Sequence, residues 1–103
     1  MDFGLKTEVI DRINGVFRKY PEIEEVILYG SRAKGEQKKV SDIDLTLKGE
    51  SLTESILSMV RSDLDDLLLP YMIDISLLGN ISNPDLIDHI SRIGREFYKK
   101  QSA

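Results

Sequence analysis

Two aspartates separated by one apolar residue constrain this chain more than any other feature. Asp42 precedes and Asp44 lies within residues 43–47, a segment in which apolar and polar residues alternate. Such alternation predicts a β-strand with one buried face and one polar face. Side chains two residues apart on a strand point to the same side, so both carboxylates face away from the core. The fold must therefore contain a strand whose polar face carries two acidic groups.

Two further segments predict strands on either side of this one. Residues 26–29 form a short apolar run, and residues 72–78 form a longer one that carries Asp74. If the second and third strands are parallel neighbours, Asp74 lies beside Asp44. The sequence then predicts that three carboxylates, counting Asp42, converge on one spot.

Three segments predict amphipathic helices. Apolar residues recur at helical spacing in residues 5–17, 52–68 and 86–97. Pro70 ends the second of these helices, and Asn83 with the following proline opens the third. The last helix is expected to carry Phe97 on its apolar face.

The order of these elements predicts an α/β (α+β) fold in which helices flank a small mixed sheet. More than twenty residues, including a helix, separate the second and third strands, which is enough for a parallel crossover. Residues 30–41 are expected to form a polar loop with one helical turn at most. Such a loop would allow the first and second strands to pair antiparallel. Residues 1–103 are expected to form a single domain.

The composition excludes several classes of protein. Of 103 residues, 41% are apolar and 31% are charged, which is the composition of a globular protein. The sequence contains no apolar run of the roughly 18 residues that a membrane-spanning helix needs. The absence of cysteine excludes disulfides and thiolate sites, and it favours the cytoplasm. A net charge of −4 argues against direct binding of nucleic acid through bulk charge.

A carboxylate cluster needs a cation. Like charges a few ångströms apart repel, and a buried charge without a partner costs several kcal/mol. Mg²⁺ prefers oxygen ligands and keeps places for water and substrate phosphates. Two such ions about 3.5–4 Å apart would clamp the attacking and leaving oxygens of a phosphoryl displacement.

The end of the first strand offers a phosphate-binding turn. Gly30 allows a phosphate to approach the backbone closely, and the hydroxyl of Ser31 adds a donor. Basic side chains of the following loop either offset the charge of a triphosphate or are simply solvated: Arg32, Lys34, Lys38 and Lys39. Of these, Arg32 is included in the predicted nucleotide site.

These motifs together resemble the nucleotidyltransferase superfamily typified by DNA polymerase beta. The match GSRAKG…SDIDL, with the later Asp74, is similar to its minimal nucleotidyltransferase family, and the resemblance extends from the first helix to residues 93–98. It implies a polymerase beta-like fold. It also implies transfer of a nucleoside monophosphate, by default AMP from ATP, with pyrophosphate leaving.

The same resemblance implies roles for individual residues and a partner. Asp42 and Asp44 hold the metals and the triphosphate, whereas Asp74 binds the catalytic metal and helps to deprotonate the acceptor hydroxyl. Gly30 and Ser31 hold the β- and γ-phosphates. Members of this minimal family are similar to antitoxins that attach AMP to a tyrosine of a HEPN-domain ribonuclease toxin, so a HEPN-domain partner is expected.

Two other functions stay open at this point. A binding module with idle carboxylates would mask a partner stoichiometrically, although clustered acids without a ligand carry a cost. An aminoglycoside-type transferase of small molecules would need a separate subunit or a homodimer groove for its substrate. His89, on the last predicted helix, is expected to be a surface or packing residue far from the motif.

Overall fold

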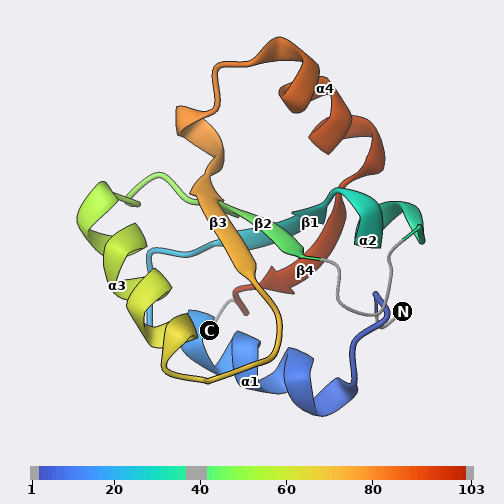
Figure 1. Cartoon of the computed structure of the whole chain (residues 1–103). Coiled ribbons are helices and arrows are strands. Elements are labelled where there is room, and N and C mark those ends of the chain that lie inside the picture. Colours follow the sequence, from blue (N-terminus) through green and yellow to red (C-terminus); the bar gives the residue numbers. More distant parts are fainter. Residues whose placement is uncertain (1–2, 37–41, 102–103) are drawn as a thin grey trace.

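The computed structural model describes residues 3–36 and 42–101, and it shows a four-stranded sheet with helices on both faces (Figure 1). The strands lie in the order β3-β2-β1-β4 and are β1 (Glu25–Tyr29), β2 (Ile43–Lys48), β3 (Ile73–Leu77) and β4 (Arg95–Lys99). The helical segments are α1 (Thr7–Phe17), α2 (Ser31–Lys34), α3 (Glu54–Asp65), the 3₁₀ turn η1 (Leu78–Asn80) and α4 (Pro84–Ile93). The predicted mixed sheet flanked by helices is confirmed.

The strand pairing also follows the prediction. β1 and β2 pair antiparallel across the loop that joins them, and β2 and β3 pair parallel through the crossover that contains α3. The parallel pair needs that crossover because a tight turn reverses the chain direction. β4 adds a further antiparallel partner to β1.

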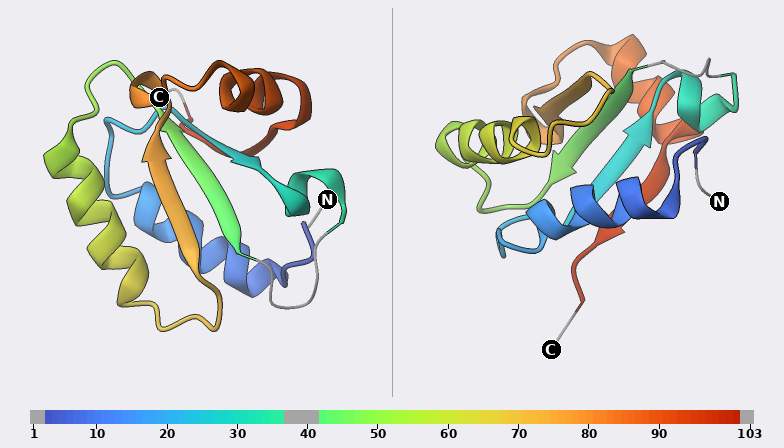
Figure 2. Two further views of the ribbon diagram at one scale, coloured as in Figure 1. Left: turned by 45° about the horizontal axis from the view of Figure 1, so that its top comes forward. Right: turned by 60° about the horizontal axis from the view of Figure 1, so that its bottom comes forward.

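The core lies on one face of the sheet, beneath α1 and α3 (Figure 2). Alternate residues of the strands point into it, and they are fully or almost fully buried: Val26, Leu28, Ile43, Leu45, Leu47, Ile75 and Leu77. α1 contributes Phe17 and α3 contributes Val60 to the same cluster. The alternation of the sequence is thus explained by a single apolar layer between the sheet and these two helices.

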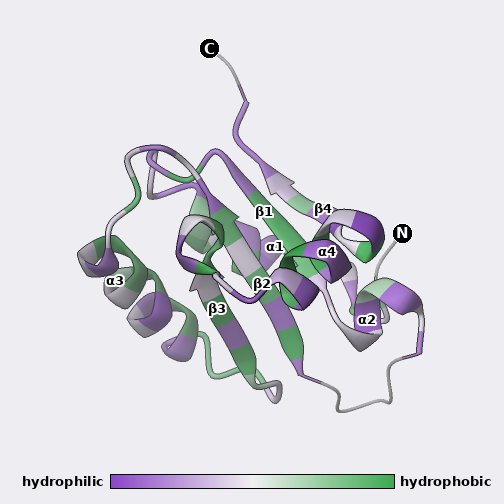
Figure 3. Cartoon of the chain, turned by 90° about the horizontal axis from the view of Figure 1, so that it is seen from above, coloured by the Kyte–Doolittle hydropathy of each residue, from purple (hydrophilic) through white to green (hydrophobic). Residues whose placement is uncertain are grey.

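The opposite face of the sheet is polar and only partly covered. α4 lies over β1 on this side (Figure 3), and Ile90 is the one residue of α4 that is buried. The alternation that sends Ile43 and Leu45 into the core turns Asp44 and Thr46 toward this face. The carboxylates therefore lie on a face that solvent and ligands can reach.

The predicted last helix is wrong beyond residue 93. Gly94 ends α4, and its backbone lies so close to Ile90 and Ile27 that a Cβ at position 94 would collide with both. The chain then pairs with β1 as β4, and Phe97 enters the core from a strand. Ile93 and Phe97 are four residues apart, a spacing that is also typical of a helix. Residues 95–99 nevertheless form a strand because they pair with β1, which is far away in the sequence.

The middle helix is shorter than predicted. It begins after Thr53, whose Oγ1 accepts a hydrogen bond from the backbone N of Ile56 at 3.2 Å. α3 ends at Asp65, and Leu68 adopts a left-handed φ of 54° outside it. Within the described part of the chain, none of the helices has the length and apolar character needed to cross a bilayer.

We expect Phe97→Ala to lower the free energy of unfolding by about 3–5 kcal/mol, the usual cost of emptying a buried aromatic site. Phe97 is 6% exposed, and its ring centroid lies 5.6 Å from that of Phe3 and 6.5 Å from that of Phe17. Urea unfolding measures the change. The exposed Glu96→Ala on the same strand is the control, and an equal loss in both variants would contradict the assignment of Phe97 to the core.

Candidate active site

Three side chains form one row across the α4 face of the sheet. The antiparallel register places Tyr29 of β1 opposite Asp44 of β2, and the parallel register places Asp44 opposite Asp74 of β3. Residues at one register position on one face are side-chain neighbours. The predicted pairing of Asp74 with Asp44 is therefore confirmed.

Asp42 lies at the edge of this pair. It is exposed and precedes β2, yet its charge raises the pKa of Asp44, so it contributes to the field of the site. In residues 3–36 and 42–101, no group of three acidic or histidine side chains is arranged to hold a metal ion by itself. Of the three carboxylates predicted to converge, Asp44 and Asp74 are therefore direct neighbours, and Asp42 lies beside this pair.

Burial and like charge act together on this row. Burial raises the pKa of Asp44, and the negative charges of Asp74 and Asp42 raise it further. Burial also raises the pKa of Tyr29, a hydrogen bond with Ser76 lowers it, and the charges of Asp74 and Asp44 raise it again. The ionised form of Asp44 is therefore held at an electrostatic cost.

This donor set fits a hard divalent cation. Asp44 and Asp74 supply carboxylate oxygens, which Mg²⁺ prefers, and the repulsion that raises the pKa of Asp44 is the cost that a cation would remove. Mg²⁺ is usually held by one or two carboxylates together with waters and substrate phosphates, so a complete protein cage is not required.

Gly30 brings the backbone against the carboxylates. Its φ of 79° and ψ of −155° lie in a region that is essentially restricted to glycine. A Cβ at this position would collide with Oδ2 of Asp44. The next residue, Ser31, is half-buried and begins α2. The predicted phosphate-binding turn and the carboxylate row are therefore immediate neighbours.

His89 belongs to this site, and its expected position far from the motif is wrong. Its Nε2 accepts a hydrogen bond from the backbone N of Gly30 at 3.1 Å. Its ring meets that of Tyr29 edge-on, with centroids 6.3 Å apart. The sequence separation of 59 residues hid this contact, although a histidine three residues after Leu86 on the inner face of α4 was a signal.

The buried side chain of Arg32 makes contacts that hold distant segments of the chain together. Its side chain is 2% exposed, its Nη1 donates to the carbonyl oxygen of Phe3 at 3.0 Å, and its guanidinium lies 5.1 Å from the ring centroid of Tyr71. These contacts tie the N-terminal segment to α2 and the start of β3. The role of Arg32 in nucleotide binding stays a prediction. Lys34 is exposed, whereas Lys38 and Lys39 lie outside the described residues.

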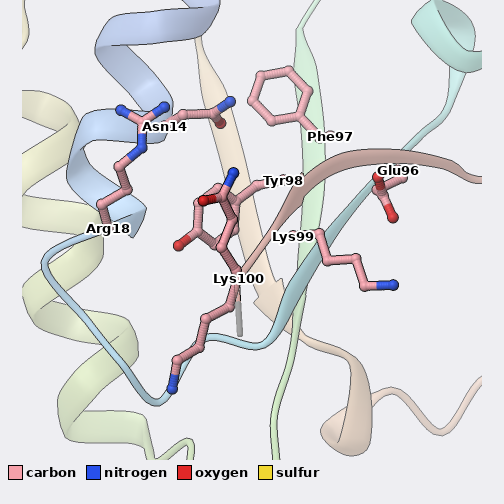
Figure 4. Close-up of a pocket in the computed structure, with 8 residues that line it drawn as sticks. Asn14, Arg18, Glu96, Phe97, Tyr98, Lys99 and Lys100 are labelled. Atoms are coloured by element: carbon pink, nitrogen blue, oxygen red, sulfur yellow. The ribbon is translucent and has the colours of Figure 1, made fainter. Parts of the chain in front are cut away.

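A sizeable groove lies elsewhere in the described part of the chain. It has a volume of about 900 Å³ and runs between α1 and the outer edge of β4 (Figure 4). None of the predicted site residues lines it; the lining residues are Asn14, Arg18, Glu96, Phe97, Tyr98, Lys99, Lys100 and Gln101. In the carboxylate row Asp74 is exposed, whereas Asp44 and Tyr29 are half-buried.

We expect Asp44 to contribute a loss of stability in the metal-free protein as pH rises from the unfolded pKa of aspartate, near 3.9, through the raised pKa of folded Asp44. In that range the folded state binds more protons than the unfolded state, so deprotonation favours unfolding. Asp44→Asn removes this contribution and should gain stability over wild type between about pH 3.5 and pH 7. Urea unfolding in a chelator measures the difference, and a gain that is the same at both pH values would contradict the raised pKa.

The family model "Polymerase beta, Nucleotidyltransferase" matches residues 11–103. The chain belongs to this family. The predicted polymerase beta-like fold and the class of activity, nucleotidyl transfer, are thereby confirmed. No curated protein matches the chain.

Solved structures show the same fold for this nucleotidyltransferase. A toxin–antitoxin complex with AMP-PNP contains a chain with 22% identity and a TM-score of 0.70, with 89% of this chain and 74% of that chain covered. The complex of a tri-AMPylated HEPN toxin of Shewanella oneidensis with its MNT antitoxin gives 18% identity and a TM-score of 0.66, with 90% and 71% covered. At such identities the likeness concerns the fold.

Proposed function

We propose that this nucleotidyltransferase moves AMP from ATP, in the presence of Mg²⁺, to a tyrosine hydroxyl of a HEPN-domain toxin and so acts as its antitoxin. The observation that carries the proposal is the pairing of Asp44 with Asp74 directly beside Gly30. The likeness to a complex with AMP-PNP supports ATP as the donor, and the likeness to a complex with an AMPylated toxin supports the acceptor.

Each residue has a role in this reaction. The backbone of Gly30 and the hydroxyl of Ser31 hold the β- and γ-phosphates, and Asp42 and Asp44 hold the triphosphate through bound Mg²⁺. When bound, Mg²⁺ supplies positive charge that offsets the charge developing on the transferring phosphoryl group. The acceptor oxygen forms a bond to the α-phosphorus, the bond to the pyrophosphate oxygen breaks, and Asp74 takes the proton of the hydroxyl.

The exposure of Asp74 supports a protein acceptor. Asp74 is exposed at the start of β3, whereas Asp44 beside it is half-buried. The residue proposed to receive the proton is therefore the more accessible carboxylate of this pair. A tyrosine presented on the surface of a partner can reach such a position without a substrate cavity. We place the reaction in the cytoplasm, where ATP and Mg²⁺ are available.

Label transfer tests this function. The chain is incubated with Mg²⁺ and the purified HEPN-domain protein, and ATP is labelled at the α- or the γ-phosphate. We expect the partner to be labelled from the α-position only, with pyrophosphate released. Label from the γ-position would indicate phosphoryl transfer, and binding without label would favour a masking module; either result would contradict the proposal.

A further inference from the structure

Helix α4 brings one imidazole to the turn that follows β1. Nε2 of His89 accepts the hydrogen bond from the Gly30 N–H at 3.1 Å, and the ring packs edge-on against Tyr29. Acceptance at Nε2 requires a free lone pair there and places the ring proton on Nδ1. The backbone N–H of Gly30 is therefore already satisfied within the protein.

The proposed function assigns this same N–H to a phosphate of the nucleotide. An amide has one hydrogen, so an imidazole nitrogen and a phosphate oxygen compete for it. We propose that His89 occupies the phosphate position of Gly30 in the free protein and is displaced when the triphosphate binds. His89 is then a positioning residue that sets nucleotide affinity, an inference that rests on the proposed function.

Displacement requires rotation of the side chain while α4 stays in place. Ile90, the next residue, is 5% exposed against the sheet, and Gly94 packs so tightly on Ile27 that there is no space for a Cβ. These contacts fix α4 on both sides of its last turn. The His89 ring is only half-buried, so it can turn outward without moving the helix.

Removal of the competitor should strengthen nucleotide binding. We expect His89→Ala to bind AMP-PNP about three- to tenfold more tightly than wild type, the scale of one net hydrogen bond. His89→Gln keeps an acceptor oxygen on a side chain that can reach Gly30, so it should stay near wild type. AMP lacks the β- and γ-phosphates and should bind equally to all three proteins.

Calorimetric titration with AMP-PNP or AMP, at saturating Mg²⁺, measures these affinities. In steady-state kinetics of His89→Ala, the KM for ATP should fall by a larger factor than kcat changes. Ser91→Ala, an exposed change on the same helix, is the control. Weaker or equal binding of AMP-PNP by His89→Ala would overturn the proposal, as would a glutamine variant that behaves like alanine. If the alanine variant does not fold, nitrogen NMR of wild type decides: AMP-PNP but not AMP must shift the Nε2 resonance of His89.

The failure of this inference can be told from failure of the proposed function. Asp44→Asn serves as the reference because it should weaken Mg²⁺-dependent binding of AMP-PNP whatever His89 does. If wild type binds AMP-PNP through Asp44 and His89→Ala binds no more tightly, only the displacement of His89 is wrong. If neither protein binds AMP-PNP in a way that depends on Asp44, both proposals are overturned.

Discussion

Asp44→Asn should reduce nucleotidyl transfer by about 10³-fold or more while the protein stays folded. In the proposed function Asp44, at the centre of the row, is a ligand for Mg²⁺, and the substitution would remove it. The charge stabilisation that a metal supplies is worth several kcal/mol, and each step of about 1.36 kcal/mol is tenfold in rate. The fold should persist because the substitution keeps the shape of the side chain and removes like-charge repulsion with Asp74. Label transfer gives the rate, and urea unfolding gives the stability.

The matched control is Asp65→Asn, which removes the same charge from an exposed position at the end of α3. It should leave the rate within about twofold of wild type because α3 lies on the opposite face of the sheet from the row and exposed charges are screened. Asp44→Asn with near-normal transfer, or Asp65→Asn with an equal loss, would contradict the assignment of catalysis to the row.

Gly30→Ala should both destabilise the protein and inactivate it. The backbone of Gly30 adopts a conformation that costs other residues about 1–3 kcal/mol, and the added Cβ would collide with Oδ2 of Asp44. Asp44 must then move, and a catalytic group displaced by about 1 Å can cost 10²-fold in rate. Urea unfolding and label transfer measure the two effects.

Gly35→Ala tests whether backbone strain alone, without a collision with Asp44, is enough to inactivate the protein. Gly35 also has a positive φ, 76°, but a Cβ there would meet nothing within 4 Å. We expect a loss of about 1 kcal/mol in stability, the cost of a left-handed backbone, with transfer preserved. If the two variants lose activity equally, contact between Gly30 and Asp44 is not what inactivates the enzyme.

The features of the site that could be predicted from sequence are those that depend on short stretches of the chain. Alternation around Asp44 and a lone acid in the third strand determine which face each carboxylate occupies. The glycine that ends the first strand marks the turn beside them. The crossover length then predicts the parallel pair that brings Asp74 to Asp44.

The remainder depends on contacts between distant parts of the chain. The helical spacing of Ile93 and Phe97 is compatible with a continued helix, and only the free edge of β1 makes residues 95–99 a strand. Gly94 was a local signal for the end of the helix. His89 and Arg32 contact segments that lie 59 and 29 residues away in the sequence. Local spacing indicates that His89 faces inward from α4, but it does not identify Gly30 as its partner.

The most direct test of the central claim is NMR mapping of Mg²⁺ and AMP-PNP on the backbone amides of the wild-type chain. We predict that the resonances of Gly30, Ser31, Asp44 and Asp74 shift, and that those along the groove between α1 and β4, such as Asn14, do not. Shifts confined to that groove, with the carboxylate row unchanged, would contradict the assignment of nucleotide binding to the row.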